Sequence, residues 1–270
     1  MSAEQRTYPE YQTLLCKRDG PVLVVTMNRP HKLNAADVQM YLDLEDLMPR
    51  IGADPDVRAV VLHGSGDRSF AAGDDISVFR WEGVAGSLGF IDLVQWVFIL
   101  VERCPKPIVG AVQGFALGFG FEIALACDVV IAATNARFGL PEITVGAVPI
   151  NTVTHGLEIL RRRVVAYLAM TGDEWLNGEQ AVTVGMAHLA VPPERLMPEA
   201  VALAHRMADW PPAAVKATKV LLNRTADLHY LEAVDIMPSV MYDEEVREGR
   251  AAFLEKRKAQ FPTILTPTLD

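Results

Sequence analysis

Short apolar runs and helical spacings follow one another along the first two thirds of the chain. Residues 13–17 and 22–27 are β-rich runs on either side of Asp19-Gly20, a dipeptide that two-residue hairpin turns favour, and they predict a β-hairpin. Near-continuous apolar runs, typical of strands buried on both faces, recur at residues 58–64, 107–113 and 129–132.

The segments between these runs have helical spacing. Steps of four and three residues predict a helix through the apolar positions Met40, Leu44, Leu47 and Ile51. We expect Asn34 to cap this helix and Pro49 to kink or end it. Further helices are predicted over residues 88–103 and 121–127, the second after a glycine-rich turn at residues 114–120. This alternation of strands and helices indicates an α/β fold with a mostly parallel sheet.

The character of the chain changes after Val191-Pro192-Pro193. Helical spacing without a further strand pattern continues through residues 194–210, 213–224 and 228–260. We therefore divide the chain into an α/β core over residues 1–193 and a helical C-terminal region over residues 194–270. Such a helical layer either serves assembly or covers the core.

Composition limits the class of protein. Of the 270 residues, 50% are hydrophobic and 22% charged, which is typical of a globular protein, and the net charge of −9 disfavours general binding to nucleic acid or to an anionic membrane. Residues 1–12 are polar, and no run reaches the roughly 20 apolar residues of a transmembrane helix. The three cysteines are far apart, which indicates reduced thiols and a cytoplasmic protein: Cys16, Cys104 and Cys127.

Two glycine-containing turns each follow a predicted buried strand. The first lies in residues 69–76 and the second in residues 114–122. Glycine permits backbone angles that leave N–H groups pointing outwards, and two such donors that converge would stabilise a developing oxyanion. Taken alone, a glycine-rich segment of this kind is usually just a turn.

Two glutamates lie in apolar surroundings. Glu122 interrupts an otherwise apolar run over residues 119–127, and Glu142 follows Leu140-Pro141. Burial raises the pKa of a carboxyl, as a general acid or base near neutral pH requires. The alternative is that each glutamate caps a helix or pairs with an arginine.

Other catalytic patterns are absent from the sequence. It contains no G-x-S-x-G elbow, no G-x-G-x-x-G fingerprint and no glycine-rich loop followed by a phosphate-binding lysine. The six histidines are dispersed without the spacing of metal ligands. We therefore expect neither a metal ion nor a redox cofactor.

Seven segments have a distinctive order and spacing along the chain: residues 26–30, 32–35, 56–62, 70–76, 114–122, 136–142 and 253–257. Their order and spacing resemble the enoyl-CoA hydratase/isomerase (crotonase) superfamily over nearly the whole chain. The resemblance implies an α/β, crotonase-like spiral of ββα units followed by a C-terminal helical trimerisation region. It also implies a homotrimer or a dimer of trimers.

The resemblance further implies an acyl-CoA thioester substrate, with coenzyme A as part of the substrate and no separate cofactor. The backbone N–H groups of Asp74 and Phe119 would hold the thioester oxygen. Glu122 would activate water for attack at Cβ, and Glu142 would donate a proton to Cα. The expected reaction is reversible syn hydration of a 2-enoyl-CoA. The residues expected near coenzyme A are Arg29, Lys32, Leu33, Ala72 and Lys256, and residues 76–81 would help to shape the acyl pocket.

Three positions depart from the family pattern. Phe119 replaces the middle of three glycines, Asp74 stands where alanine is common, and residues 150–155 replace a glycine-rich loop near the catalytic water. An isomerase that moves a double bond, or another enolate-based acyl-CoA enzyme such as a thioester hydrolase or dehalogenase relative, therefore stays open. A non-catalytic member that binds RNA or protein is a further alternative, which the net charge and the two glutamates disfavour. Acyl chain length, and the choice between trimer and hexamer, are not fixed by the sequence.

Overall fold

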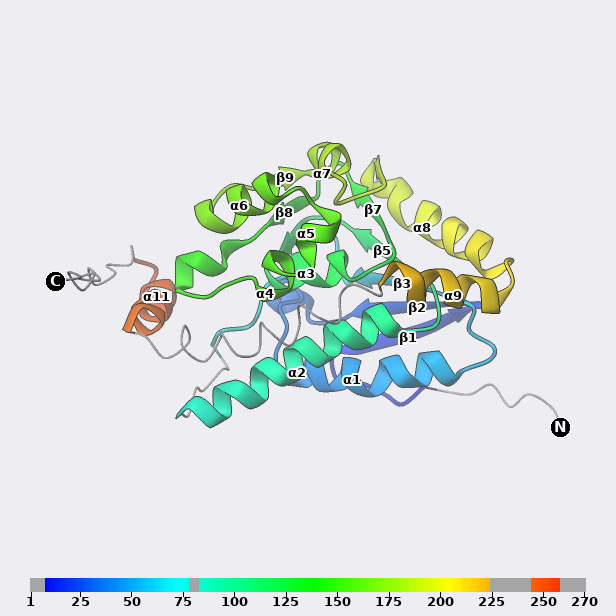
Figure 1. Cartoon of the computed structure of the whole chain (residues 1–270), viewed down its shortest axis with the longest axis horizontal. Helices are drawn as coiled ribbons and strands as arrows, with labels where there is room; N and C mark the ends of the chain where they lie inside the picture. The colour runs from blue at the N-terminus through cyan, green and yellow to red at the C-terminus, as the bar shows by residue number, and fades with distance from the viewer. Residues whose placement is uncertain (1–7, 78–82, 224–243, 258–270) are drawn as a thin grey trace.

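The fold is built around two sheets. The computed structural model describes residues 8–77, 83–223 and 244–257, and Figure 1 shows the arrangement of its elements. The larger sheet has six strands in the order β1-β2-β3-β5-β7-β10. Only β1 runs antiparallel to its neighbour. The strands are β1 (Leu14–Asp19), β2 (Val22–Met27), β3 (Ala59–Gly64), β5 (Ile108–Val112), β7 (Val129–Ala133) and β10 (Leu189–Val191).

The smaller sheet has four short strands in the order β4-β6-β8-β9. They are β4 (Ser69–Ala72), β6 (Phe115–Leu117), β8 (Arg137–Gly139) and β9 (Leu176–Asn177). Three consecutive strand pairs, β3/β4, β5/β6 and β7/β8, each place their first strand in the larger sheet and their second in the smaller one. The chain thus winds between two sheets, and the expected α/β fold is confirmed.

Helices cover both sheets. Those that follow the early strands are α1 (Val38–Ala53), α2 (Gly83–Arg103) and α3 (Phe119–Leu125), and α1 and α2 lie side by side in Figure 1. Later helices are α4 (Ile150–Val153), α5 (Gly156–Ile159), α6 (Arg162–Thr171), α7 (Gly178–Val184), α8 (Pro193–Ala208), α9 (Pro212–Leu222) and α11 (Glu244–Leu254), with 3-10 helices at Pro30–Lys32 and Pro141–Val145. Within the described ranges, no helix is both long enough and apolar enough to cross a membrane.

The core has two main parts on opposite faces of the larger sheet. One lies between the sheets and the helices α1, α2 and α3, and includes the fully buried Tyr41, Phe70 and Phe98. The other is covered by α8, whose buried residues recur every four positions and are mostly small: Leu196, Ala200, Ala204 and Ala208. Small side chains let this helix approach the sheet closely. The division of the chain at residue 193 stays a prediction.

The hairpin and the first helix differ in detail from the expectation. Asp19 pairs with Val22, so the hairpin loop is Gly20-Pro21 and not Asp19-Gly20. Asp37, not Asn34, caps α1, because its side chain accepts a hydrogen bond of 2.9 Å from the backbone N–H of Met40. The helix also continues past Pro49 to Ala53. Buried residues on both sides of Pro49 hold this continuation in place: Leu44, Leu47, Met48 and Ile51.

Other boundaries also shift. The predicted glycine-rich turn contains the strand β6, and α3 begins at Phe119 instead of residue 121. The helix α2 begins at Gly83, five residues earlier than predicted. Of the predicted helix over residues 228–260, the structure describes α11 and residues 255–257, and the rest lies outside the described residues. The same holds for residues 78–81 of the predicted acyl pocket.

Candidate active site

A cavity lies where β4 and β6 end, against the helices α1, α2 and α3. The 3-10 helix Pro141–Val145 and Phe253 of α11 complete its walls. Asp74, Phe119, Glu122 and Glu142 all line this cavity. The four residues that the sequence predicts as catalytic or oxyanion-binding therefore meet in one place, although they come from three separate parts of the chain.

The sheet register explains why the two glycine turns meet. Strands β4 and β6 are parallel neighbours, and Ala72 is paired with Leu117. Gly73 and Gly118 follow these two residues, with φ angles of +79° and +51° that side chains rarely adopt. A Cβ atom on Gly118 would lie 3.4 Å from Gly73 Cα, so the two turns are in close contact.

The next residue in each turn has a free backbone donor. Within the described part of the chain, neither the N–H of Asp74 nor that of Phe119 donates to any backbone or side-chain acceptor. The flanking residues are paired: Asp75 N–H donates to Ala36 O over 2.7 Å, and Gly118 N–H donates to Gly139 O over 3.1 Å. Both turns are thus held by their neighbours while one donor in each stays available at the cavity.

Glu122 lies in the first turn of α3 and is 7% exposed. Its Oε1 accepts hydrogen bonds from Thr152 N–H over 2.9 Å and from Thr152 Oγ1 over 3.1 Å, and its Oε2 accepts one from Asn151 Nδ2 over 3.4 Å. Burial raises the pKa of the Glu122 carboxyl to about 7, although these hydrogen bonds act in the opposite direction. Glu122 can therefore change its protonation state near neutral pH.

The altered loop at residues 150–155 supplies these hydrogen bonds. It folds into the short helix α4, where Asn151 and Thr152 are buried and face Glu122. His155 ends the loop and lies 3.2 Å from Glu102 of α2, which ties the loop to the core. The departure from the family pattern thus replaces glycines by side chains that hold the first glutamate.

Glu142 has the opposite surroundings. It lies in the 3-10 helix Pro141–Val145, and its buried Oε2 has no hydrogen-bond partner among the described residues. Burial, followed by the negative charge of Glu122, raises the pKa of Glu142 well above its usual range. One glutamate is therefore stabilised as a carboxylate by hydrogen bonds, whereas the other favours its protonated form.

A third acid shares the cavity. Asp74 Oδ1 accepts a hydrogen bond of 2.7 Å from the hydroxyl of Tyr41, a buried residue of α1. Burial raises the pKa of Asp74 to about 6. Tyr41 was not among the expected site residues, because it comes from a segment distant in sequence and has no local motif to mark it. Thr152 lies in the altered loop at residues 150–155 that the family resemblance places near the catalytic water, but it was not singled out there.

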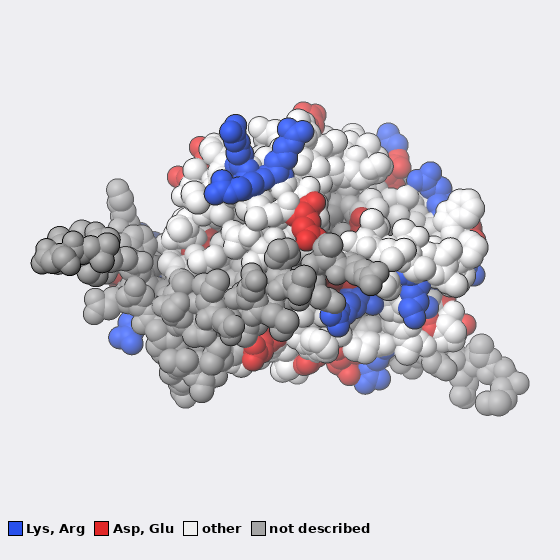
Figure 2. Space-filling view, viewed as in Figure 1, with Lys and Arg blue, Asp and Glu red and all other residues white. Residues whose placement is uncertain are grey.

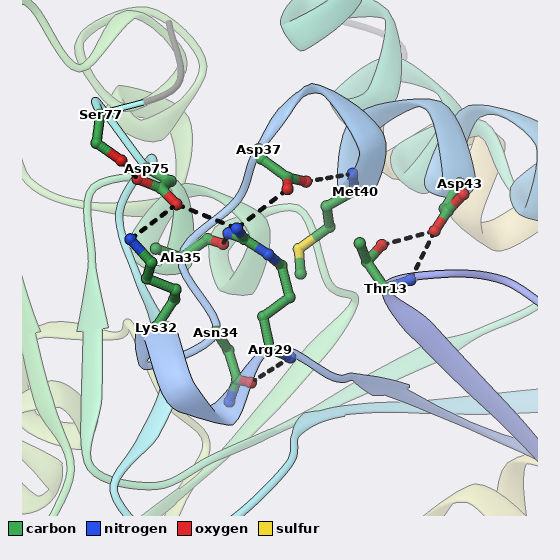
Figure 3. Close-up of polar contacts among 10 residues, drawn as sticks. All are labelled: Thr13, Arg29, Lys32, Asn34, Ala35, Asp37, Met40, Asp43, Asp75 and Ser77. Atoms are coloured by element: carbon green, nitrogen blue, oxygen red, sulfur yellow. Dashed lines mark hydrogen bonds and ion pairs between the residues drawn. The ribbon is translucent and has the colours of Figure 1, made fainter.

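Arg29, expected near coenzyme A, lies inside an ion-pair network. Its Nη2 lies 3.0 Å from Asp75 and 3.1 Å from Asp37, as Figure 3 shows, and its side chain is only 12% exposed. Arg29 also donates to Ala35 O. It therefore links the start of α1 to the turn that carries Asp74, and a role in binding coenzyme A stays a prediction.

The other expected coenzyme A residues lie in and around the same region, and Ala72 lines the cavity itself. Lys32 is 47% exposed, with Nζ 3.6 Å from Asp75. The carbonyl of Leu33 accepts a hydrogen bond of 3.1 Å from Ala72 N–H, which brings these two residues together next to Gly73. Lys256 is exposed just beyond α11, three residues after Phe253 of the cavity wall.

Basic side chains elsewhere on the surface are separated. On the face shown in Figure 2, Lys and Arg occur in small groups with Asp and Glu between them. One such group lies near α6, where Arg161, Arg162 and Arg163 are exposed. Among the residues that the structure describes, no three His, Cys, Asp or Glu side chains are arranged to hold a metal ion.

Comparison with known proteins identifies the family. The enoyl-CoA hydratase/isomerase profile matches residues 17–263, which is most of the chain. The chain belongs to the enoyl-CoA hydratase/isomerase family. This confirms the superfamily that the sequence motifs resemble.

Members of the enoyl-CoA hydratase/isomerase family are similar to the chain over nearly their full length. Crotonyl-CoA hydratase of Syntrophomonas wolfei is 34% identical, with 93% of this chain and 98% of the relative covered. A probable enoyl-CoA hydratase of Rhizobium meliloti is 36% identical with the same coverage. The crystal structure of an enoyl-CoA hydratase from Mycobacterium avium subsp. paratuberculosis has a TM-score of 0.83 at 26% identity, covering 94% of this chain and all of that one.

Proposed function

We propose that the protein is an enoyl-CoA hydratase, a hydro-lyase that adds water reversibly and with syn geometry across the double bond of a 2-enoyl-CoA thioester. The observation that carries this proposal is the difference in hydrogen bonding between the two glutamates. Glu122 accepts hydrogen bonds from Thr152 and Asn151, whereas Glu142 Oε2 has no partner. Such a pair supplies a base and an acid in one cavity at neutral pH.

The proposed reaction begins at Glu122. Its carboxylate takes a proton from water while the water oxygen forms a bond to Cβ of the substrate. The π electrons of the double bond move towards the thioester and leave negative charge on the carbonyl oxygen. Glu142 then gives its proton to Cα, the charge returns from the oxygen, and the product is a 3-hydroxyacyl-CoA.

The enolate oxygen needs donors during this sequence. The free N–H groups of Asp74 and Phe119 are the proposed oxyanion hole, and their position at neighbouring turns supports this role. Loss of one such donor typically lowers kcat by about 100- to 1000-fold. Because both donors belong to the main chain, the unusual side chains at these positions leave them intact.

The remaining parts of the proposal concern the substrate and its surroundings. The acyl-CoA substrate brings its own coenzyme A, and the proposed reaction uses acid and base groups without a further cofactor. Lys32, Leu33, Ala72 and Lys256 are the residues we propose for coenzyme A, together with Arg29. A role in fatty acid metabolism and a cytoplasmic location belong to the same proposal, and the cysteines agree with it because Cys16, Cys104 and Cys127 are all free thiols.

We also propose a homotrimer or a dimer of trimers. The helix α9 supports assembly because it leaves a continuous apolar end exposed: Val220 is 53% exposed, Leu221 66% and Leu222 71%. Three adjacent large apolar residues in contact with water are typical of a surface that another subunit covers.

The function is tested with Glu122→Gln and Glu142→Gln, assayed by hydration of crotonyl-CoA. Each change should lower kcat by at least 100-fold, because each removes one proton-transfer group. Glu179→Gln, an exposed glutamate of α7, is the matched control and should retain normal turnover. Undiminished hydration by either cavity variant would overturn the assignment. Exchange of deuterium into Cα without formation of a 3-hydroxyacyl-CoA would indicate an isomerase instead.

A further inference from the structure

The cavity contains a buried amide that the proposed reaction does not use. Gln95 of α2 is 3% exposed and lines the cavity, on the same helix face as Ile91 and Phe98. Its Oε1 is buried, and no described residue gives it a hydrogen bond. An unpaired buried carbonyl is unfavourable unless a ligand or an ordered water supplies a donor.

A second acceptor faces the same space. Asp74 Oδ1 is occupied by the Tyr41 hydroxyl, but Oδ2 accepts no hydrogen bond within the described part of the chain. Tyr41 is itself fixed by edge-to-face contacts with Phe90 and Phe119, whose ring centroids lie 5.6 Å and 5.2 Å away. The Asp74 carboxyl is therefore held in place with one oxygen available to a ligand.

The charge of the cavity also favours a ligand that donates hydrogen bonds. Its walls contain the acids Asp74, Glu122 and Glu142, and none of the described lining residues is Lys, Arg or His. An acyl group with a carboxylate would be repelled, and a plain hydrocarbon would leave the acceptors of Gln95 and Asp74 unpaired. A group that donates hydrogen bonds would satisfy both.

We propose that Gln95 and Asp74 are specificity-determining residues that favour an acyl group carrying a hydrogen-bond donor, either a hydroxyl or a protonated amine. This inference rests on the proposed hydratase function and adds the class of acyl group. It assigns Tyr41 as the residue that positions the Asp74 carboxylate. The side chain of Asp74 thus has a role separate from that of its backbone N–H.

Three substrates of similar size distinguish a preference for a hydroxyl, for an ammonium group or for an acyl group without a donor. They are 2-pentenoyl-CoA, 4-hydroxycrotonyl-CoA and 4-aminocrotonyl-CoA, which carry a methyl, hydroxyl or ammonium group at the same place. We expect kcat/KM of the unmodified protein to be at least tenfold higher for the hydroxyl or the ammonium substrate than for 2-pentenoyl-CoA. Of the hydroxyl and ammonium substrates, the one with the higher kcat/KM identifies which donor the cavity binds. Similar values for all three, or a preference for 2-pentenoyl-CoA, would overturn the inference.

Gln95→Leu and Asp74→Ala test the two residues. Each should lower the ratio of kcat/KM between the preferred donor substrate and 2-pentenoyl-CoA by about tenfold or more. A merely structural role would lower kcat/KM for all substrates alike and leave the ratio unchanged, which would count against the inference. Asp92→Asn, an exposed residue on the same helix, is the control and should keep the ratio of the unmodified protein.

A binding measurement separates this inference from the hydratase assignment. S-Pentyl-CoA, S-(4-hydroxybutyl)-CoA and S-(4-aminobutyl)-CoA are thioether analogues that can neither be hydrated nor cyclise, because they lack the thioester carbonyl, and their Kd values are measured by calorimetry. Tighter binding of a donor analogue that is lost in Gln95→Leu would support the inference even if no enoyl-CoA were hydrated. Equal Kd values in the unmodified protein would overturn it even if crotonyl-CoA were hydrated.

Discussion

Single contacts decide how the two glutamates differ. Glu122 and Glu142 are both enclosed by the cavity, but Glu122 accepts three hydrogen bonds from α4, two of them from Thr152, whereas Glu142 Oε2 accepts none from the described residues. Hydrogen bonds to a carboxylate favour the ionised form. The contrast between the proposed base and the proposed acid therefore depends mainly on one threonine that is 30 positions away in the sequence.

Thr152→Val tests this contact. The backbone N–H stays, but the Oγ1 hydrogen bond to Glu122 is lost, so the pKa of Glu122 should rise further and kcat should fall about tenfold. In a profile of kcat/KM against pH for crotonyl-CoA, the limb that reports ionisation of Glu122 should move to higher pH. Thr183→Val on α7, whose hydroxyl bonds only a backbone carbonyl, is the control. An unmoved limb would contradict the role of Thr152.

The raised pKa of Glu122 also predicts how stability depends on pH. The unfolded chain loses this proton near pH 4.5, whereas the folded chain keeps it until about pH 7. Between these values the unfolded state binds fewer protons at this site, so Glu122 lowers the free energy of unfolding as pH rises. Glu122→Gln removes this contribution. Between pH 4 and pH 8 the free energy of unfolding of the variant should therefore rise by up to about 3 kcal/mol relative to that of the unmodified protein.

Urea unfolding at a series of pH values measures this difference. Only the change in the difference with pH counts, because Glu122→Gln also alters the hydrogen bonds of the site. Glu179→Gln should follow the pH dependence of the unmodified protein, since the side chain is exposed. A difference that stays constant between pH 4 and pH 8 would show that burial does not raise this pKa.

At the scale of secondary-structure elements, the apolar pattern predicts the long, buried strands and helices. The strands β2, β3, β5 and β7 and the helix α1 follow directly from apolar runs and helical steps. The strands β6, β8 and β9 have only two or three residues, and they form because partners distant in sequence supply their hydrogen bonds. No local pattern of two or three residues can predict such pairing.

Local sequence patterns also predict only some of the residues of the candidate site. The motifs indicate Glu122 and Glu142, and the turns that carry Asp74 and Phe119, because the residues around them are distinctive. Tyr41 and Gln95 lie within regular helical spacing and resemble core positions in the sequence. Their role at the cavity depends on the packing of α1 and α2 against the turn after β4, which only the three-dimensional structure contains.

The helix α9 is held by one buried charge. Lys219 is buried, and its Nζ lies 2.7 Å from Asp128 Oδ2 and also donates to the carbonyls of Val101 and Lys106. Asp128 in turn accepts a hydrogen bond from Ile108 N–H at the start of β5. The lysine therefore joins α9 to the end of α2 and to the beginnings of the inner strands β5 and β7 of the larger sheet.

Lys219→Ala should lower the free energy of unfolding by about 3 kcal/mol or more, because it leaves Asp128 without its cation. Chemical denaturation measures the loss. Lys216→Ala, an exposed lysine of the same helix, should change stability by less than about 0.5 kcal/mol. Lys219→Met combined with Asp128→Asn should recover part of the loss. If Lys219→Ala unfolds like the unmodified protein, the ion pair does not hold α9.

At the scale of the whole molecule, the winding of the chain between two sheets creates the cavity. Each winding of the chain adds a strand to the smaller sheet next to the strand from the winding before. The residues that follow β4 and β6 therefore become neighbours, although about 45 positions separate them in the sequence. The helices α9 and α11 belong to the region that we predict for assembly. Phe253 of α11 reaches the cavity wall, so this region and the site are joined.

The proposed oligomer predicts the behaviour of α9. Leu221→Asp combined with Leu222→Asp places charges on the exposed apolar end of the helix and should convert a trimer or hexamer into monomers. Light scattering coupled to size-exclusion chromatography measures the mass. Leu42→Asp, at an exposed leucine of α1, is the control and should leave the mass unchanged. A monomeric unmodified protein would contradict the proposed assembly.

The two free amides at the ends of β4 and β6 have a consequence for how this protein can diversify. Every amino acid except proline carries a backbone N–H, so positions 74 and 119 can exchange one side chain for another while the donors persist. Under the proposed mechanism, mutation can therefore change the cavity lining next to the thioester carbonyl without removing the two oxyanion donors.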